Sequence, residues 1–180
     1  MNRKELNEYG KSPILARKID LVKRIVEKAI TKNENWYIAF SGGKDSTVML
    51  DIIQKCCLNA PAVWVDDEWW LPETMEYMKR MVACGLDLHQ VQAQVKHARF
   101  FTAHEESNIR SGRDYTYDKG WAGAFIGIRA DESNKRRVML RTYGTLYYAQ
   151  VNQQWQCYPL AWWSVYDVWA YIFSRGLDYN

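Results

Sequence analysis

The stretch with the clearest chemical potential is Ser41-Gly42-Gly43-Lys44-Asp45-Ser46. Its glycines allow a tight turn and a close approach of the backbone to a ligand. The lysine ammonium group and the serine hydroxyls, joined by the hydroxyl of Thr47, are donors that suit phosphate oxygens. These residue types in this order indicate an anion-binding turn.

The flanking residues place this turn between a strand and a helix. Residues 36–40 are rich in aromatic and β-branched types and predict a buried strand. After the turn, apolar residues recur at helical spacing, at Val48, Met49, Ile52, Ile53 and Cys56. We therefore expect a helix that starts near Asp45 or Ser46, whose unpaired N–H groups and dipole favour a bound phosphate.

The turn differs from the Walker loop. Ile38 stands where that motif needs its first glycine, and Asp45 stands where it needs Ser or Thr. A plain glycine turn capped by Asp45 or Ser46 is the simpler alternative. The strand–turn–helix context favours nucleotide binding.

Charged residues follow two other predicted strands. Asp66-Asp67-Glu68 comes after the strand at 62–65, and open α/β sheets bind ligands outside the carboxyl ends of their strands. A basic run begins at Arg129, directly after the strand at 124–128, and arginine suits phosphate or sulfate. An ordinary solvated surface is the alternative for each of these runs. The members of the basic run are Arg129, Lys135, Arg136, Arg137 and Arg141, with Asp131 and Glu132 placed to orient them.

A polar stretch at 107–120 predicts a long loop. Its basic residues either reach an anionic substrate or belong to a solvated, mobile loop, and the sequence leaves both alternatives open. These residues are Arg110, Arg113 and Lys119.

Length and composition predict one compact domain. The chain has 180 residues, 48% of them hydrophobic and 25% charged, and its net charge of +3 is too small to indicate a nucleic-acid partner. The cysteines form no C-x-x-C pair and the histidines lack metal-ligand spacing. With no signal peptide and no long apolar run, we expect a cytoplasmic protein with reduced thiols and no membrane association.

Strands alternate with helices along the chain, which predicts an α/β fold with a mainly parallel sheet and right-handed crossovers. We expect residues 1–11 to be loosely held, a helix from Ser12-Pro13, and a division into a helical segment at 1–35 and a nucleotide-binding part at 36–180. Later elements are a third strand at 86–95, a hairpin within 146–158 and a final helix from Ser164 to Gly176.

Four segments together resemble one family. They are Ser41–Ser46, the strand before Asp66 with Pro72-Glu73-Thr74, Gly127-Ile128-Arg129 with Glu132-Ser133 and Arg136, and Pro159-Leu160 with Trp163-Ser164 and residues 167–172. These segments are similar to the phosphoadenosine phosphosulfate (PAPS) reductase family, which also contains the small subunit of ATP sulfurylase. That family belongs to the adenine-nucleotide alpha-hydrolase superfamily, whose loop of the PP-loop ATP pyrophosphatase type has the pattern Ser-Gly-Gly-x-Asp-Ser.

The resemblance implies a Rossmann-like (HUP-type) sheet flanked by helices on both faces, with a nucleotide at the loop. It implies catalytic roles for Lys44, Asp45 and Arg129, with Asp45 helping to place Mg²⁺. Asp67 is an extra carboxylate outside the family pattern, and it either helps to hold Mg²⁺ or is simply solvated. The nucleotide-binding residues that it implies are Ser41, Gly42, Gly43, Lys44, Asp45, Ser46, Asp66, Gly127, Arg129, Glu132 and Arg136.

Departures from the family pattern bear on the substrate. The reductases carry a catalytic cysteine in a C-terminal tail, and this chain stops at Asn180, about where that tail would begin. Reductases also often have a degraded loop, whereas this loop is complete. Asp67 stands where relatives commonly have Thr. The first two departures favour ATP over PAPS or adenosine phosphosulfate (APS).

Three functions remain open. The favoured one is an ATP-dependent enzyme that cleaves between the α- and β-phosphates, transfers adenylyl to an unknown anionic acceptor and releases pyrophosphate. The second is a thiol-dependent sulfonucleotide reductase whose cysteine comes from elsewhere. The third is a nucleotide-sensing protein without catalysis. A homodimer or a partner subunit would be compatible with each.

Overall fold

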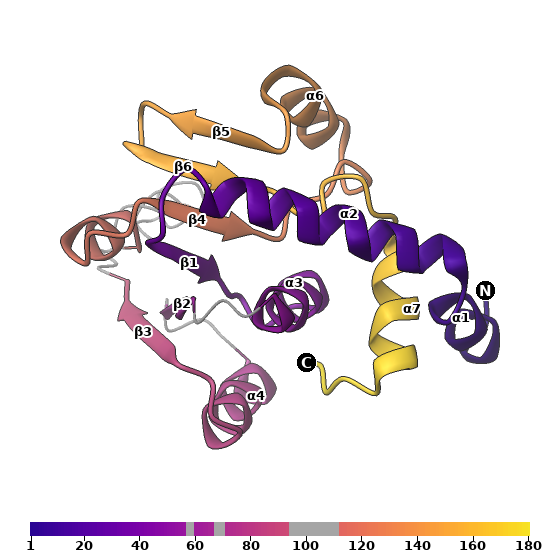
Figure 1. The fold of residues 1–180 in the computed structure, drawn as a ribbon. Helices are drawn as coiled ribbons and strands as arrows, with labels where there is room; N and C mark the ends of the chain where they lie inside the picture. Colours follow the sequence, from indigo (N-terminus) through magenta and orange to yellow (C-terminus); the bar gives the residue numbers. More distant parts are fainter. Residues whose placement is uncertain (57–59, 67–70, 94–111) are drawn as a thin grey trace.

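The computed structural model describes residues 1–56, 60–66, 71–93 and 112–180. The described strands form one six-stranded sheet of order β3-β2-β1-β4-β6-β5 (Figure 1). The strands are β1 (Trp36–Ala39), β2 (Ala62–Asp66), β3 (Leu88–Gln92), β4 (Gly123–Ile126), β5 (Leu146–Ala149) and β6 (Gln154–Cys157). The helices are α1 (Arg3–Gly10), α2 (Pro13–Ile30), α3 (Lys44–Lys55), α4 (Pro72–Ala83), α6 (Asn134–Tyr143) and α7 (Val165–Arg175), together with residues 112–118.

The sheet is parallel except at one edge, as the sequence predicts. β1 pairs in parallel with β2 on one side and β4 on the other, so that Ile38 lies opposite Ala62 and Phe125. β5 pairs antiparallel with β6, which confirms the hairpin. The chain passes outward from β1 to β3 and then resumes at β4 on the other side of β1. The carboxyl ends of β1 and β4 therefore flank a topological switch point, where open α/β sheets bind ligands.

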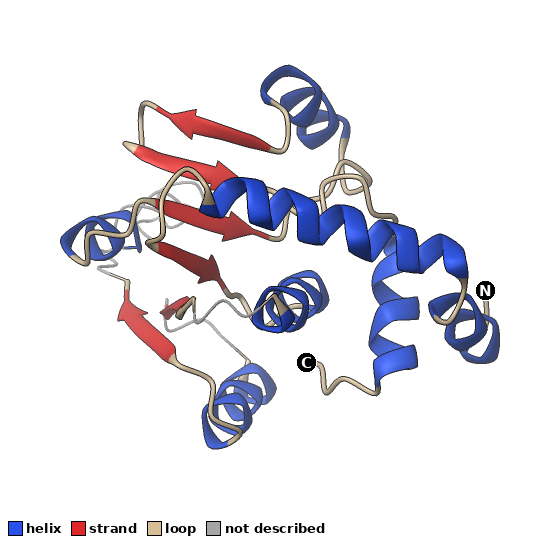
Figure 2. Ribbon diagram, in the orientation of Figure 1, coloured by secondary structure: helices blue, strands red, loops and turns tan. Residues whose placement is uncertain are grey.

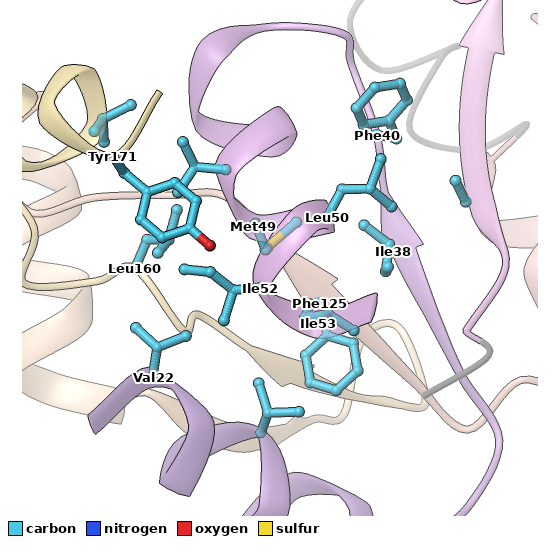
Figure 3. Packing of buried hydrophobic residues seen from close by; sticks show 14 of the residues in the cluster. Val22, Ile38, Phe40, Met49, Leu50, Ile52, Ile53, Phe125, Leu160 and Tyr171 are labelled. Atoms are coloured by element: carbon cyan, nitrogen blue, oxygen red, sulfur yellow. The ribbon is translucent and has the colours of Figure 1, made fainter. Parts of the chain in front are cut away.

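Most of the core lies on one face of the sheet. Trp36, Ile38 and Phe40 point to this face, and Trp36 stacks on Phe125 with ring centroids 4.7 Å apart. α2, α3 and α7 cover it, with α3 packed between the other two (Figure 2). Figure 3 shows apolar side chains of α3 between Val22 of α2 and Tyr171 of α7. This burial holds the amino end of α3 in a fixed place against β1.

The opposite face carries helical residues 112–118 and α6. Nδ1 of His89 on β3 lies 2.7 Å from the hydroxyl of Tyr115, and Tyr37 of β1 packs near Trp121. α6 is attached through a second cluster that includes Leu140, Tyr158 and Ala161. Helices therefore flank both faces, which confirms the predicted fold class.

The prediction of a polar loop at 107–120 is wrong where the structure describes it. Residues 107–111 lie outside the described part, and residues 112–118 are helical. Polar contacts help to anchor this helix, since Thr116 is 1% exposed, donates to the Arg113 carbonyl and accepts from Gln154. A helix anchored by polar contacts leaves no apolar stripe in the sequence.

The prediction that residues 1–11 are loosely held is also wrong. Asn2 and Glu5 form a capping box at the start of α1. Leu6 is buried, and a Cβ at Gly10 would lie 2.4 Å from Ser174 of α7, so the two helices touch closely. Asp167 of α7 accepts hydrogen bonds from Tyr9 and Lys18, each at 2.6 Å. These contacts are remote in sequence, so composition alone does not reveal them.

Other boundaries differ by a few residues. β3 is shorter than the predicted strand at 86–95, of which residues 94 and 95 lie outside the described part, and β4 ends at Ile126 rather than at position 128. The Ser12 cap of α2 is confirmed, as are the Ser164 capping box and the left-handed Gly176 of α7. No helix within the described ranges is both long and apolar enough to cross a membrane.

Candidate functional site

The turn after β1 leads directly into α3. The helix begins at Lys44, with Gly43 as its N-cap, one or two residues before the predicted start near Asp45 or Ser46. Gly43 offers no capping side chain, and the first N–H groups of α3 have no described side-chain partner. Donors at a helix start that lack a cap, together with the helix dipole, form an anion-binding arrangement.

Gly42 sets the direction of this turn. Its φ is +75°, which favours glycine, and a Cβ there would lie 2.8 Å from Cε of Met78. α4 thus packs against the back of the turn. The front is left to face the carboxyl edge of the sheet.

The hydroxyl groups of the turn divide into two roles. Ser41 Oγ lies 3.3 Å from Ser46 Oγ and accepts from the N–H of Gly43 at 3.4 Å, while Ser46 donates to the Gly43 carbonyl at 2.9 Å. Both serines line the hollow described below. Thr47 instead is buried, with its hydroxyl 3.0 Å from that of Tyr77. The prediction that Thr47 offers a donor to a phosphate is therefore wrong in this structure.

Asp45 is held between two cations. Its Oδ2 accepts from Lys44 Nζ at 3.0 Å, and its Oδ1 accepts from Arg129 Nε at 2.6 Å. Arg129 is 3% exposed and also contacts Asp131 and the carbonyl of Trp163, each at 3.4 Å. The guanidinium of Arg129 therefore sits behind Asp45 and fixes its position. Lys44 is 31% exposed and remains near the surface of the turn.

The donor set around Asp45 fits Mg²⁺ poorly. Both oxygens of Asp45 already have cationic partners, and the described part of the chain holds no group of three His, Cys, Asp or Glu side chains that could bind a metal ion. Asp67, the other residue predicted to bind Mg²⁺, lies outside the described residues. Mg²⁺ prefers carboxylate and phosphate oxygens together with water. We therefore assign no step to a metal.

The end of β4 touches the start of α3. A Cβ at Gly127 would lie 3.3 Å from the backbone N of Ser46 and 3.4 Å from the carbonyl carbon of Asp45. Only glycine allows this approach without a shift of the backbone. Gly127 thus positions the first turn of α3 beside the switch point.

A third cation near the turn, after Lys44 and Arg129, comes from α6. Ser133 caps this helix by accepting from the N–H of Arg136 at 3.2 Å. The Arg136 guanidinium pairs with Glu132 at 2.5 Å, and Glu132 also accepts from the N–H of Arg129 at 2.9 Å. Arg136 is 44% exposed, so its guanidinium can still reach a ligand.

These groups surround one cleft of about 550 Å³, here called the loop hollow. Its size lies within the usual range of roughly 300–1,000 Å³ for small-molecule sites. The predicted residues that line it are Ser41, Gly43, Lys44, Asp45, Ser46, Gly127, Glu132 and Arg136. Its apolar walls come from β1, β2 and β4 and from Ile128, which follows β4. The resemblance implies that the second strand flanks the nucleotide, but the predicted site residues do not include the wall residues Val63, Trp64, Val65, Ile126 and Ile128. Their position at strand ends beside the turn is the signal that could have found them.

Three predicted residues do not line this hollow. Asp66 is 7% exposed and accepts from Nε2 of Gln90 at 2.7 Å, so it is joined to β3. Arg129 lies behind Asp45, and Gly42 faces Met78. We infer that these residues support the site without forming its surface. Of the basic residues considered at 107–120, Arg110 lies outside the described part and Lys119 sits over the Tyr115 ring.

The sequence model of the phosphoadenosine phosphosulfate reductase domain family matches residues 35–180. The chain belongs to this family.

Relatives found by sequence carry a different name from the relative found by structure. The chain is 27% identical to sulfate adenylyltransferase subunit 2 of Pseudomonas fluorescens and 26% identical to that of Geotalea uraniireducens, over 85% of its own length. It spans only 61% and 62% of those two proteins. The fold is similar to that of PAPS reductase from Candida auris, with a TM-score of 0.71, 15% identity and coverage of 100% of this chain and 90% of that one.

A second solved structure shares the fold. It is a U34-tRNA thiolase from Methanococcus maripaludis, with a TM-score of 0.66, 17% identity and coverage of 92% of this chain and 66% of that one. At such identities both solved structures bear on the fold alone.

Proposed function

We propose that the chain binds ATP in the loop hollow, cleaves it between the α- and β-phosphates and transfers the adenylyl group to an anionic acceptor. An acceptor oxygen bonds to the α-phosphorus, the bond to the bridging oxygen breaks, and pyrophosphate leaves. The observation that carries this proposal is the uncapped start of α3 beside Lys44, at the switch point of the sheet. The family and the relatives named as an adenylyltransferase subunit support it.

In this mechanism the protein acts by positioning and electrostatics. Negative charge grows on the departing pyrophosphate, and the N–H groups at residues 44–46 with the Lys44 ammonium would stabilise it. Removing one such donor from an enzyme typically costs about 2.7–4 kcal/mol of transition-state stabilisation. Asp45 would hold Lys44, and Arg129 would hold Asp45. Arg136 would bind a phosphate or the acceptor, because it is the exposed arginine on this hollow.

Further parts of the proposal concern the surroundings of the site. The walls formed by Val63, Ile126 and Ile128 would exclude water from one side of the nucleotide. Since the relatives are named as a subunit, we propose that a partner chain completes the enzyme, with a homodimer as the alternative. A cytoplasmic location, where ATP is available, is part of the same proposal.

A sulfonucleotide reductase is the second candidate, because the family model carries that name. The described cysteines offer no nucleophile at the loop hollow. Cys157 is buried, and this burial raises the pKa of its thiol, so that the unreactive protonated form is favoured. Cys84 follows α4, at the edge of the sheet where strands begin. This candidate therefore needs a thiol from outside the described residues.

The experiment that tests the proposal measures pyrophosphate release from ATP with sulfate and other oxyanions as acceptors, with and without thiol and PAPS. Acceptor-dependent pyrophosphate release is the expected result. Release of sulfite from PAPS would select the reductase. Nucleotide-dependent thermal stabilisation without turnover would select a sensing protein.

A further inference from the structure

A second hollow of about 410 Å³ lies beside the loop hollow on the same face of the sheet. Here called the β6 hollow, it extends from the shared wall toward β6 and lies under helical residues 112–118. Small side chains of β1 and β4, Ala39 and Ala124, leave room above the strands. The shared wall consists of Ala39, Val63, Val65, Ile126 and Ile128, so the two hollows adjoin.

Gln154 presents a hydrogen-bond acceptor to this hollow. It is only 4% exposed, and its amide nitrogen donates to Thr116 Oγ1 at 3.2 Å and to the Trp121 carbonyl at 2.8 Å. Both amide hydrogens are therefore used. The carbonyl oxygen of Gln154 has no hydrogen-bond partner among the described residues, and because Gln154 lines the hollow this oxygen can accept a hydrogen bond from a ligand.

Gln156 presents hydrogen-bond donors to the same hollow. Its oxygen accepts from the hydroxyl of Tyr147 at 2.9 Å and from that of Tyr158. Burial raises the pKa of Tyr158, so its hydroxyl stays a donor. These two donors fix the amide so that oxygen faces the tyrosines. The amide N–H groups of Gln156 have no described partner, and they remain for a ligand.

The two glutamines act together because they lie two positions apart on β6, where side chains share a face. The hollow therefore offers one fixed acceptor and one fixed donor group from a single strand. Arg113 is the one charged residue among its described lining, and its guanidinium already pairs with Asp114 at 3.3 Å. An anion has little to bind here. A neutral ligand with a donor and an acceptor on one edge would hydrogen-bond to both groups.

We propose that the β6 hollow binds a neutral planar group with adjacent donor and acceptor atoms, such as a nucleobase or a carboxamide, alongside the nucleotide in the loop hollow. The evidence for this binding site is the pair of glutamines and does not depend on the proposed function. Its assignment to the acceptor of the adenylyl group rests on the proposed function. If that assignment holds, the acceptor carries its reacting oxyanion toward the loop hollow and a neutral planar part over β6, and it is larger than a bare inorganic oxyanion.

The test uses uracil and nicotinamide as probes, with their binding followed by saturation-transfer NMR at millimolar concentrations. Each probe is titrated into the full chain with and without a saturating non-hydrolysable ATP analogue. We expect saturable binding that persists with the analogue. Competition with the analogue would mean that the hollow holds the base of ATP, and it would overturn the proposal of a separate ligand. Absence of saturable binding by both probes would also overturn it.

Variants at Gln156 locate the site. Gln156→Glu keeps an acceptor for both tyrosines and removes the donors, and Gln156→Met removes the donors without adding charge. Each should weaken probe binding about tenfold or more, the usual effect of losing one hydrogen bond. Gln150→Glu makes the same charge change on the exposed hairpin turn and should have no effect. Equal probe binding by wild type and by both folded Gln156 variants would overturn the proposal. These experiments measure probe binding and not ATP turnover. A chain that does not turn over ATP could therefore still show, or fail to show, the predicted probe binding, so the two proposals are tested separately.

Discussion

The position of Lys44 suits a phosphate-binding role without a role in stability. Its side chain is 31% exposed and contacts Asp45, and it lies at the first position of α3. Lys44→Ala should therefore weaken ATP binding about tenfold, as expected for loss of a charge-assisted hydrogen bond, while the free energy of unfolding changes by less than about 0.5 kcal/mol. Calorimetric titration with ATP measures the affinity. Lys79→Ala, on the exposed side of α4, is the matched control. Equal ATP affinities of Lys44→Ala and wild type would remove the phosphate role of Lys44.

Arg129 differs from Lys44 because it is buried. From the sequence alone it is an anion clamp, but its Nε contacts Asp45 at 2.6 Å and only 3% of the residue is exposed. Arg129→Lys should lower the free energy of unfolding by about 1–3 kcal/mol, since a lysine keeps the charge but loses the planar set of donors to Asp45, Asp131 and Trp163.

Chemical denaturation of Arg129→Lys tests this assignment, with Arg141→Lys on the exposed part of α6 as control. A variant that is as stable as wild type but binds ATP weakly would contradict it. That result would mean that Arg129 contacts the nucleotide directly instead of supporting Asp45.

The junction between β4 and α3 determines the geometry of the site at the level of elements. Gly127→Ala would place a Cβ 3.3 Å from the backbone of Ser46, and backbone cannot move as a side chain can. We expect a loss of about 1–3 kcal/mol in stability from overpacking, and weaker ATP binding because the first turn of α3 shifts. In Gly43→Ala the Cβ meets only Ser41 Oγ at 3.5 Å, so this variant is the steric control for stability alone, because Gly43 itself lines the loop hollow. Unfolding curves and ATP titrations that match wild type for Gly127→Ala would show that the junction is loose.

The same elements show what the sequence can reveal. The strand, turn and helix around residues 41–46 follow from alternation and spacing, which are local signals. The exact start of α3 does not, because Asp45 turns to Arg129, 84 positions away, instead of capping the helix. Helical residues 112–118 were missed for a similar reason, since Thr116 is anchored by Gln154 of β6. The β6 hollow depends on such distant contacts throughout, and its glutamines form no motif.

At the scale of the whole molecule, Asp167 joins the first two helices to the last. It is 1% exposed and accepts from Tyr9 and Lys18 at 2.6 Å, and from Ser164 within the capping box. Burial raises the pKa of Tyr9 to about 12, as does its bond to Asp167, so the phenol remains a donor at neutral pH. α1 and α2 are therefore attached to α7 through one carboxylate, in addition to their apolar contacts.

This arrangement predicts both a mutational and a pH effect. Burial on its own would raise the pKa of Asp167, but the bonds from Lys18, Tyr9 and Ser164 outweigh it, and the pKa lies below its ordinary value of 3.8. A carboxyl group with a lower pKa in the folded state adds stability above its unfolded pKa, and that stability is lost as the pH falls through the folded value. Asp167→Asn should therefore cost about 2–4 kcal/mol at pH 7, and the difference from wild type should shrink below about pH 4.

Denaturant unfolding of wild type and Asp167→Asn across this pH range measures the difference. Asp20→Asn serves as control, because Asp20 is 64% exposed and its ion pair with Lys23, at 3.7 Å, is a surface pair. Such pairs contribute little to the free energy of unfolding. A constant difference between wild type and Asp167→Asn down to acid pH would mean that the carboxylate charge is not what joins the helices. The apolar contact of Leu6 and the close approach at Gly10 would then carry the attachment of α1 to α7.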